Sequence, residues 1–477
     1  MGPETANLAE KSLKSRFQRL KATSLRLRNE PLSERKARLR KLESWIHSHR
    51  DRIRQSIHDD YKKPLLEVDT SEIYPVLAEL RHALRHLEEW ARPVKIDATL
   101  TFVGTRSEIR YEPKGTCLII APWNFPFNLC LGPLVSCLAA GNNAIVKPSE
   151  LTPHTSALVR ELVAEVFSED IAIVVEGGVE VSQQLLELPF DHIFFTGSTA
   201  VGKLVMQAAG KNLSSVTLEL GGKSPTLIDR TANLNDAAKR IAFGKFFNNG
   251  QTCIAPDYLL VEKTVHDRFV GLLKEEVLKL FGESGSVSEQ SASYARLATT
   301  RQYHRISELV EDALQRGAHA ERLGTFNEKV NFMAPVFLTE ISPDARIWEE
   351  EIFGPVLPIE TFESVGEAVE IINNRPKPLA LYIFSHDKGF QEHLLRHTSS
   401  GTACINECVL QFTHPNLPFG GVNQSGIGKS HGQYGFLAFS NEKPILRQKS
   451  GWATPYLLYP PYTNRMKKIV DLLLKWF

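Results

Sequence analysis

Apolar side chains recur at helical spacing through the first ninety residues of the chain. Positions three or four residues apart share one face of a helix, so this period predicts helices that bury one side. Proline cannot continue a helix, and we therefore expect the region to end before Pro93. The apolar positions are Leu39, Leu42, Ile46, Ile53, Ile57, Ile73, Val76, Leu80, Leu84 and Leu87.

Residues 99–111 alternate between apolar and polar positions around a turn at Gly104. This period of two predicts a β-hairpin. Because the hairpin lies between two other regions of the chain, we expect it to form an arm that pairs with a second subunit. Its apolar positions are Leu100, Phe102, Ile109 and Tyr111.

Short β-branched runs and helical stretches alternate from Thr116 onward, and a second such series begins near Pro225. This rhythm is typical of parallel α/β sheets, so the predicted fold class is α/β with two parallel-sheet domains. In the first series, strands are expected at 117–120, 144–146 and 171–175, with helices at 133–140 and 155–167. In the second, strands are expected at 258–261, 336–338, 356–359 and 381–384.

The last thirteen residues predict a short amphipathic helix. It is too short to cross a bilayer, but it can lie on a membrane, cap a substrate opening, or pack on another subunit or on its own protein. The apolar face carries Met466, Ile469, Val470, Leu473 and Trp476, and the opposite face Lys468, Asp471 and Lys475.

Composition narrows the class of protein. A length of 477 residues suggests two or three domains, and 42% hydrophobic with 23% charged residues is ordinary for a globular protein. A net charge of +1 gives no overall attraction to nucleic acid. Residues 1–54 hold fifteen Lys or Arg against six Asp or Glu, which we interpret as a solvated helical face rather than a lipid or nucleic-acid patch.

Six cysteines without regular spacing or a CxxC motif indicate neither a disulfide framework nor a zinc site, so we expect no metal and a reducing compartment. Met1–Glu10 lacks the apolar core of a secretory signal, and no apolar run reaches about eighteen residues. The predicted location is cytoplasmic, with peripheral membrane contact through the C-terminal tail as the alternative.

Cys253 is the candidate nucleophile. It lies in the polar segment Asn249-Gly250-Gln251-Thr252-Cys253, after an amphipathic stretch at 237–247, so a loop between packed elements is expected. A reactive thiol needs such a place. The other cysteines lie in or beside apolar stretches and are expected to be core thiols: Cys117, Cys130, Cys137, Cys404 and Cys408.

Glu219 stands thirty-four residues earlier (253 minus 219), in the segment Leu218-Glu219-Leu220-Gly221-Gly222. Its apolar neighbours can raise the pKa of the carboxyl group toward working pH. A carboxylate tuned in this way can serve as a general base.

Two segments are candidates for binding a dinucleotide. In 192–202 a strand runs into a glycine turn and a helix, whose first amides can hold phosphate. Thr199 replaces the middle glycine of GxGxxG, and any βα turn can contain two glycines, so the motif alone is ambiguous. After another strand, Lys147 and Glu150 can reach ribose hydroxyls, or the lysine can simply cap the strand end.

Two further segments are ambiguous in the same way. Asn124 is clamped between prolines and aromatic residues in 121–127, where its amide can donate to a developing oxyanion or only cap a turn. The acidic run 349–351 precedes a turn, and one of its carboxylates can hold a sugar unless the run is a solvated face.

Taken together and in this order, the motifs resemble those of the aldehyde dehydrogenases over residues 10–450. The short N-terminal region, KPSE and IAPDY resemble the branch that contains the fatty and aromatic (class 3-like) aldehyde dehydrogenases. The matching stretches are APWNFPFNL, KPSEL, FTGSTAVGK, LELGGKSP, GQTCIAPDY, EEIFGPVLP and LPFGGVNQSGIG.

This resemblance implies an NAD(P)-dependent oxidation of an aldehyde to a carboxylic acid. By resemblance, Cys253 attacks the carbonyl and Asn124 with the Cys253 amide holds the oxyanion. Glu219 then activates water against the thioester. No metal is implied.

The resemblance also implies a cofactor site. Gly197 and Ser198 are expected at the pyrophosphate, with Gly202 in the same turn. Glu150 would repel a 2′-phosphate, which favours NAD, with NADP possible. The remaining contacts are Lys147 with Glu150 at the adenine ribose, Glu351 with Phe353 at the nicotinamide ribose, and Trp123.

A three-part architecture follows from the resemblance, with a homodimer as the expected assembly and a late strand of the arm near 437–446. The expected parts are a Rossmann-like NAD-binding domain at 1–97 and 113–221, a catalytic domain at 222–412, an oligomerisation arm at 98–112 and 430–450, and a C-terminal tail at 451–477.

One departure from the family pattern is Asn423, where glycine is more frequent. Asparagine tolerates positive φ, so we expect the turn to survive.

Two alternative functions remain at this stage. One is a coenzyme A-acylating aldehyde dehydrogenase, against which the presence of Glu219 counts. The other is a non-catalytic structural or membrane-surface protein. Aromatic residues near the motifs favour a medium- or long-chain aliphatic or an aromatic aldehyde: Trp123, Phe125, Phe127 and Phe412.

Overall fold

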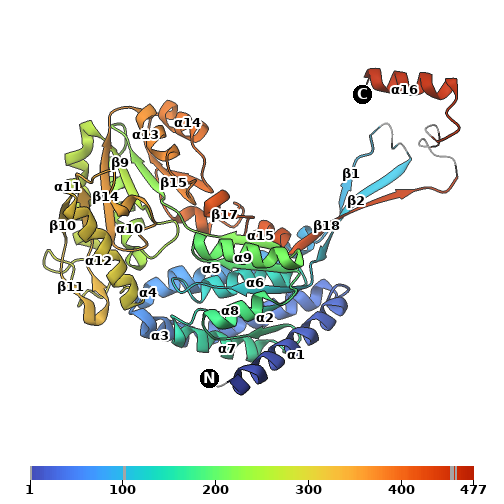
Figure 1. The fold of residues 1–477 in the computed structure, drawn as a ribbon, viewed down its shortest axis with the longest axis horizontal. Helices are drawn as coiled ribbons and strands as arrows, with labels where there is room; N and C mark the ends of the chain where they lie inside the picture. Colours follow the sequence, from blue (N-terminus) through green and yellow to red (C-terminus); the bar gives the residue numbers. More distant parts are fainter. Residues whose placement is uncertain (1–2, 100–101, 103, 452–455, 457–458, 477) are drawn as a thin grey trace.

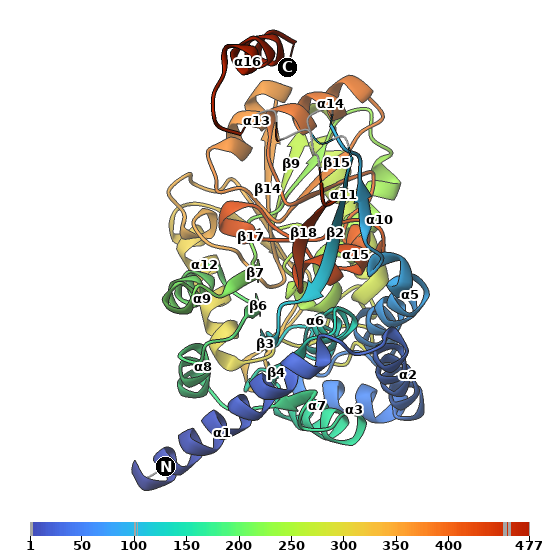
Figure 2. The same ribbon diagram turned by 90° about the vertical axis from the view of Figure 1, so that its right-hand side faces the viewer.

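A computed structural model describes residues 3–99, 102, 104–451, 456 and 459–476. Figures 1 and 2 show two α/β units side by side, with a β-arm and a terminal helix projecting from them. The fold class predicted from the alternation of strands and helices is confirmed.

The first unit is built on a six-stranded sheet with the order β17-β7-β6-β3-β4-β5. All of its strands are parallel except β17, which pairs antiparallel with β7. The strands are β3 (Thr116–Ile120), β4 (Asn143–Lys147), β5 (Ala172–Val174), β6 (His192–Thr196), β7 (Ser215–Glu219) and β17 (Gly426–Ile427).

Helices cover both faces of this sheet, because successive strand residues point to opposite sides. Cys117 and Ile119 of β3 pack in the core cluster beneath α2, α3, α5, α6 and α7, whereas Leu118 and Ile120 pack against α1, α8 and α9. The helices are α1 (Pro3–Leu27), α2 (Leu32–Ser48), α3 (Arg50–Tyr61), α4 (Leu65–Val68), α5 (Tyr74–Trp90), α6 (Asn128–Ala139), α7 (Pro153–Val166), α8 (Val179–Leu186) and α9 (Thr199–Asn212).

The second unit is built on a seven-stranded sheet with the order β10-β13-β14-β9-β8-β15-β16, in which only β10 runs antiparallel. Its strands are β8 (Pro225–Ile228), β9 (Tyr258–Glu262), β10 (His319–Arg322), β13 (Val336–Thr339), β14 (Val356–Phe362), β15 (Ala380–Phe384) and β16 (Thr402–Ile405). Its helices are α10 (Leu234–Phe246), α11 (His266–Phe281), α12 (Thr300–Gln315), α13 (Val365–Asn373) and α14 (Lys388–His397), with a small pair β11 (Phe326–Asn327) and β12 (Phe332–Met333).

The arm is a three-stranded antiparallel sheet with the order β1-β2-β18. It contains β1 (Val94–Ile96), β2 (Thr105–Pro113) and β18 (Ser440–Gln448). β1 and β2 form an antiparallel hairpin whose first strand lies at 94–96; of the alternating segment, Leu100, Thr101 and Val103 lie outside the described residues. Residues 432–438 form helix α15 (Gly432–Ala438) against α5 and α6, and only then does β18 begin.

The cysteines and the basic N-terminal region were also the subject of predictions from the sequence. Cys117, Cys130, Cys137 and Cys408 are buried as predicted, but Cys404 is partly exposed because it lies on β16, the edge strand of the second sheet. The basic N-terminal region carries paired charges: Arg52 and Glu161 pair at the surface, whereas Asp69, which pairs with Arg50 and Arg54, and Glu30, which pairs with Arg38, are largely buried.

The C-terminal helix α16 (Asn464–Trp476) lies apart from both units, beyond the arm (Figure 1). Met466, Ile469, Val470 and Leu473 of its apolar face are partly exposed, and Leu472 and Leu474 beside that face are 60% and 78% exposed. Among the described residues, no helix is long and apolar enough to cross a membrane.

Candidate active site

The predicted site residues of the first unit lie at one edge of its sheet. Carboxyl ends of parallel strands meet at the same edge, where α/β proteins bind their ligands. Trp123 and Asn124 follow β3, Lys147 is the last residue of β4, Gly197 and Ser198 follow β6, and Glu219 is the last residue of β7.

Cys253 and Glu219 line the same pocket, although they come from different units of the chain. The segment that carries Cys253 leads from α10 of the second unit toward β9. The pocket wall is largely apolar and includes Tyr74, Pro75, Ala78, Leu129, Pro133, Phe194, Phe412, Pro415 and Phe419.

The backbone before Cys253 turns left-handed at three successive residues. Asn248, Asn249 and Gly250 have φ values of 52°, 54° and 72°. A Cβ atom at Gly250 would also collide with the carbonyl oxygen of Gly354, so glycine is required there for both conformation and space.

The thiol of Cys253 is protonated at neutral pH. Burial, and then the carboxylates of Glu351 and Glu219, raise its pKa above the ordinary value, while the backbone N–H groups of Cys253 and Ile254 act in the opposite direction. Forming the reactive thiolate therefore requires a base within the pocket.

Glu219 has the properties of such a base. Burial raises the pKa of its carboxyl group to about 7, although the hydroxyl of Ser430 and the charge of Lys429 lower it. Ser430 Oγ donates to Glu219 Oε1 at 2.8 Å. The second oxygen, Oε2, is buried without a hydrogen-bond partner among the described residues, so it is available to accept a proton.

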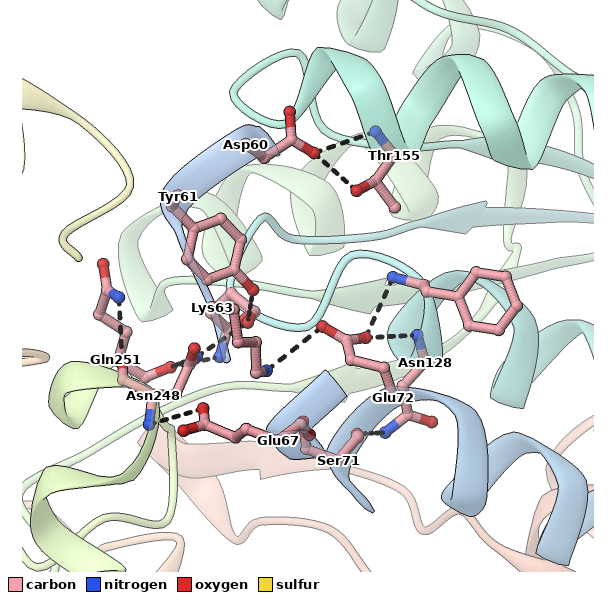
Figure 3. A network of polar contacts seen from close by, with 12 residues as sticks. Asp60, Tyr61, Lys63, Glu67, Ser71, Glu72, Asn128, Thr155, Asn248 and Gln251 are labelled. Carbon is pink, nitrogen blue, oxygen red and sulfur yellow. Dashed lines mark hydrogen bonds and ion pairs between the residues drawn. The ribbon is translucent and has the colours of Figure 1, made fainter. Parts of the chain in front are cut away.

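Asn124 is fixed against the segment that carries Cys253. Its Nδ2 donates to the backbone oxygen of Gln251 at 3.0 Å. Its own backbone oxygen accepts from Tyr61 Oη and from Asn248 Nδ2, each at 2.9 Å. Figure 3 shows Tyr61, Asn248 and Gln251 converging at this point. An amide has two N–H bonds, so one of them remains for an oxyanion.

The turn after β6 fits a phosphate group. Ser198 caps the N-terminus of α9, where the first backbone N–H groups have no partner within the helix. A Cβ atom at Gly197 would lie 2.5 Å from the Phe195 ring, and one at Gly202 would lie 2.7 Å from Leu220. The glycines thus let the turn and helix approach the sheet closely.

Lys147 and Glu150 lie together at the end of β4. Lys147 Nζ is 2.7 Å from Glu150 Oε2, with the lysine buried and the carboxylate exposed. The lysine therefore orients a carboxylate that faces solvent at the ligand-binding edge.

Glu351 and Phe353 come from the loop between β13 and β14. The Glu351 carboxylate lies against Gly221, and burial followed by the charge of Asp257 raises its pKa to about 8. The Phe353 and Trp123 rings meet edge to face with centroids 5.3 Å apart. These residues from the second unit thus face those of the first across the site.

Several features were not predicted from the sequence. Ser430 carries no motif signal beyond following the glycine-rich segment, although it contacts Glu219. Of the aromatic residues near the motifs, Phe412 lines the pocket, whereas Phe127 is buried in the core and Phe125 stacks on Phe247. Asn423 has a φ of 55°, so the prediction that asparagine keeps this turn is confirmed.

Comparisons with known proteins agree with this geometry. A model of the aldehyde dehydrogenase family matches residues 4–445. The 4,4'-diaponeurosporen-aldehyde dehydrogenase of Staphylococcus aureus is 41% identical over 441 residues, which are 92% of this chain and 94% of that protein. Aldehyde dehydrogenase family 3 member A2 of Rattus norvegicus is 41% identical over 450 residues, 94% of this chain and 91% of that protein.

A solved structure of the substrate-bound state of Staphylococcus aureus AldH has a TM-score of 0.91 and 40% sequence identity. The match covers 97% of this chain and 99% of that one. The similarity therefore extends over both units and the arm.

Proposed function

The chain belongs to the aldehyde dehydrogenase family, and we propose that Cys253 is the nucleophile with which it performs the family's reaction. The enzyme oxidises an aldehyde to a carboxylic acid with NAD(P) as the oxidant. One observation carries the assignment of Cys253: it shares a pocket with Glu219, whose pKa is about 7. A thiol beside a tuned carboxylate supplies both the nucleophile and the base that thioester chemistry needs.

In the first half of the reaction, Glu219 accepts the proton of the Cys253 thiol and the thiolate forms a bond to the carbonyl carbon. The carbonyl oxygen becomes an oxyanion, which accepts hydrogen bonds from the free N–H of Asn124 Nδ2 and from the Cys253 amide. When the cofactor is bound, its nicotinamide ring would supply the hydride acceptor. A thioester on Cys253 remains.

Between the two halves, Glu219 releases the proton of the thiol to solvent. In the second half it accepts a proton from water while the hydroxide adds to the thioester carbonyl. The C–S bond then breaks and the carboxylic acid leaves. The free Oε2 of Glu219, held in place through Ser430 at Oε1, supports this role.

The cofactor residues proposed are those at the sheet edge. Gly197, Ser198 and Gly202 would hold the pyrophosphate, and Lys147 with Glu150 the adenine ribose. Glu351, Phe353 and Trp123 would hold the nicotinamide ring and the ribose attached to it. The exposed carboxylate of Glu150 would repel a 2′-phosphate, which supports a preference for NAD over NADP.

For the substrate, we propose a medium- or long-chain aliphatic or an aromatic aldehyde. Much of the pocket wall is apolar, including Tyr74, Leu129, Phe412 and Phe419. The similarity to a dehydrogenase named for diaponeurosporen-aldehyde supports the same class. The ratio kcat/KM should therefore rise with alkyl chain length, and a flat or falling series would refute this choice.

The arm supports a homodimer as the assembly. Strand β18 pairs only with β2 among the described residues, so its other edge carries unpaired backbone groups. Removing residues 440–448 should convert a dimer to a monomer in light scattering. A monomeric intact enzyme would contradict the proposal.

For the C-terminal tail, we propose peripheral contact with a membrane surface and a cytoplasmic location. The exposed Leu472 and Leu474 on an amphipathic helix support this role. Sedimentation with anionic vesicles should depend on residues 465–477, and equal sedimentation without them would exclude it.

The variant Glu219→Gln tests the mechanism. We expect a slowed burst of NADH, because Glu219 no longer accepts the thiol proton, followed by still slower turnover, because water is no longer activated. A coenzyme A-acylating enzyme would instead form acyl-coenzyme A, and it would release no free acid when coenzyme A is absent. Absence of both burst and slowing would remove Glu219 from the reaction, and a Cys253→Ser enzyme with normal turnover would refute the nucleophile.

A further inference from the structure

Three charged side chains from the N-terminal helical region lie between the two segments that carry Asn124 and Cys253. Lys63 and Glu72 are fully buried, and Lys63 Nζ is 3.4 Å from Glu72 Oε1. Glu67 lies beside them (Figure 3). Burying charges is costly unless each is paired or hydrogen-bonded, so their partners define what this triad of Lys63, Glu67 and Glu72 does.

Glu72 holds the segment that carries Asn124. Its Oε2 accepts hydrogen bonds from the backbone N–H groups of Phe127 at 3.2 Å and Asn128 at 2.9 Å. These groups lie at the start of α6, three and four residues after Asn124. The carboxylate therefore fixes where the segment from β3 turns into the helix.

Glu67 holds the segment that leads to Cys253. Its Oε1 accepts from the backbone N–H of Asn248 at 3.0 Å. Asn248 is the first of the three residues with left-handed backbone that precede Cys253. A non-glycine residue in that conformation persists only where its surroundings hold it.

Lys63 bridges the two segments through aromatic rings. Its ammonium lies 4.1 Å from the centroid of the Phe125 ring and 5.6 Å from that of Phe247. The two rings stack with centroids 5.9 Å apart, and each is adjacent in sequence to Asn124 or Asn248. A desolvated cation over two rings is a favourable contact that depends on their separation.

A π-helical turn places both carboxylates toward these segments. Residues five apart on an α-helix point about 140° away from each other. Asp69–Ile73 forms an i→i+5 turn between α4 and α5, which reduces the angle between Glu67 and Glu72. One helical segment can therefore contact both halves of the site at once.

We propose that Lys63, Glu67 and Glu72 are positioning residues that set the placement of the Asn124 amide relative to Cys253. Direct links complete the arrangement, since Asn248 Nδ2 donates to the backbone oxygens of both Asn124 and Gln251. None of the three residues lines the pocket that contains Cys253 and Glu219, so the triad acts through Asn124. This inference rests on the oxyanion role proposed for Asn124.

The test is a double-mutant cycle between Glu67 and Asn124, read as the rate constant of NADH formation in a single turnover. Glu67→Ala leaves the Asn248 N–H without its acceptor. A misplacement of about 1 Å can cost on the order of 100-fold, so we expect a 10- to 100-fold loss. The Kd for NAD should stay within about twofold. In an Asn124→Ala background the same change should cost less than about twofold, because the amide it positions is absent.

Matched variants separate positioning from a general loss of stability. Glu67→Gln keeps a side-chain oxygen at the same reach and should restore most of the rate. Glu30→Gln weakens another partly buried pair, Glu30 with Arg38, and should lower the melting temperature without changing the rate constant. If Glu67→Ala does not fold, Lys63→Met replaces it in the cycle, because methionine keeps the contact with both rings but removes the charge.

The outcomes are distinct. Equal fold losses in both backgrounds, or no restoration by Gln, would overturn the positioning role. Normal turnover of Asn124→Ala alone would instead refute the proposed role of Asn124. A rate loss in Glu30→Gln equal to that in Glu67→Ala would show that stability, and not placement, is being measured.

Discussion

The hydrogen bond from Ser430 to Glu219 offers a direct way to move the pH dependence of the reaction. Ser430 Oγ donates to Oε1 of the carboxyl group at 2.8 Å. Such a bond stabilises the ionised form, and it opposes the burial that raises the pKa to about 7. Ser430→Ala removes the donor and leaves the burial, so the pKa must rise further.

The magnitude follows from ordinary values. A hydrogen bond to a charged group contributes about 1.5 to 3 kcal/mol, and about 1.4 kcal/mol corresponds to a tenfold change in an ionisation equilibrium. The pH midpoint of a step that needs ionised Glu219 should move from about 7 in the wild type to about 8 or above. With a midpoint near 7, the wild-type rate should rise roughly tenfold between pH 6 and pH 8, because the ionised fraction does.

The assay is the steady-state rate of acid release after the NADH burst, measured from pH 5.5 to 9.5. Ser136→Ala is a matched control. Ser136 Oγ donates to Glu79 at 3.3 Å, and Glu79 is a second carboxyl group of the same pocket whose pKa burial also raises to about 7. Loss of that hydroxyl perturbs the pocket to a similar extent but leaves the hydrogen bond to Glu219 in place. The pH midpoint of the Ser136→Ala enzyme should therefore stay within about 0.3 pH units of the wild-type midpoint.

Three results would refute this reasoning. The Ser430→Ala profile can keep the wild-type midpoint, which would mean that Glu219 does not limit the step. It can move to lower pH, which would reverse the inferred sign of the hydrogen bond. Ser136→Ala can produce the same shift, which would assign the titration to the pocket in general or to Glu79.

Other substitutions test the remaining roles. Asn124→Ala should lower kcat by about 10²- to 10³-fold while calorimetry finds little change in NAD affinity, and near-normal turnover would exclude it as an oxyanion donor. Glu150→Ser should raise the ratio of kcat/KM for NADP over NAD on the order of tenfold, and an unchanged ratio would place that discrimination elsewhere. Gly250→Ala should lower the free energy of unfolding by more than Gly317→Ala, which costs about 1 kcal/mol. Both glycines have positive φ, but only at Gly250 would a Cβ atom meet backbone, and equal losses in urea denaturation would disprove the clash.

The parallel strands were the most predictable part of the fold. The runs at 117–120, 144–146 and 171–175 correspond to β3, β4 and β5 within one residue at each end. These strands are buried on both faces, so all of them have an apolar run at their centre that is unlike a surface segment. Their order also brings the motifs that follow them to one edge.

The arm shows where this signal fails. All three residues of β1 are exposed, and most of β18 is exposed as well. With neither face buried, the pattern of apolar residues does not specify which segment pairs with β2. The alternation at 99–111 therefore did not reveal the strand at Val94–Ile96, which pairs with β2 through backbone groups that any sequence possesses.

Contacts between distant polar residues were not predictable at all. Ser430 and Glu219 are 211 positions apart, and Glu67 and Asn248 are 181 apart. A hydroxyl or carboxylate in a non-periodic segment has the same local sequence whether it faces water or a catalytic group. A π-helical turn such as Asp69–Ile73 shifts the face of a helix by an amount that the apolar period does not reveal.

The position of the proposed base depends on one of these distant contacts. After the second sheet is complete, the chain returns to the edge of the first, where Gly426 pairs with Glu219 and the Leu220 N–H donates to Ser425. The same short segment then brings Ser430 to Glu219 and the Gly432 N–H to Glu79. Glu219 and Glu79, the two carboxyl groups of the pocket, are thus both oriented by the segment 425–432. Their pKa values therefore depend on the packing of this late segment against the first unit, and not only on the strand that carries Glu219.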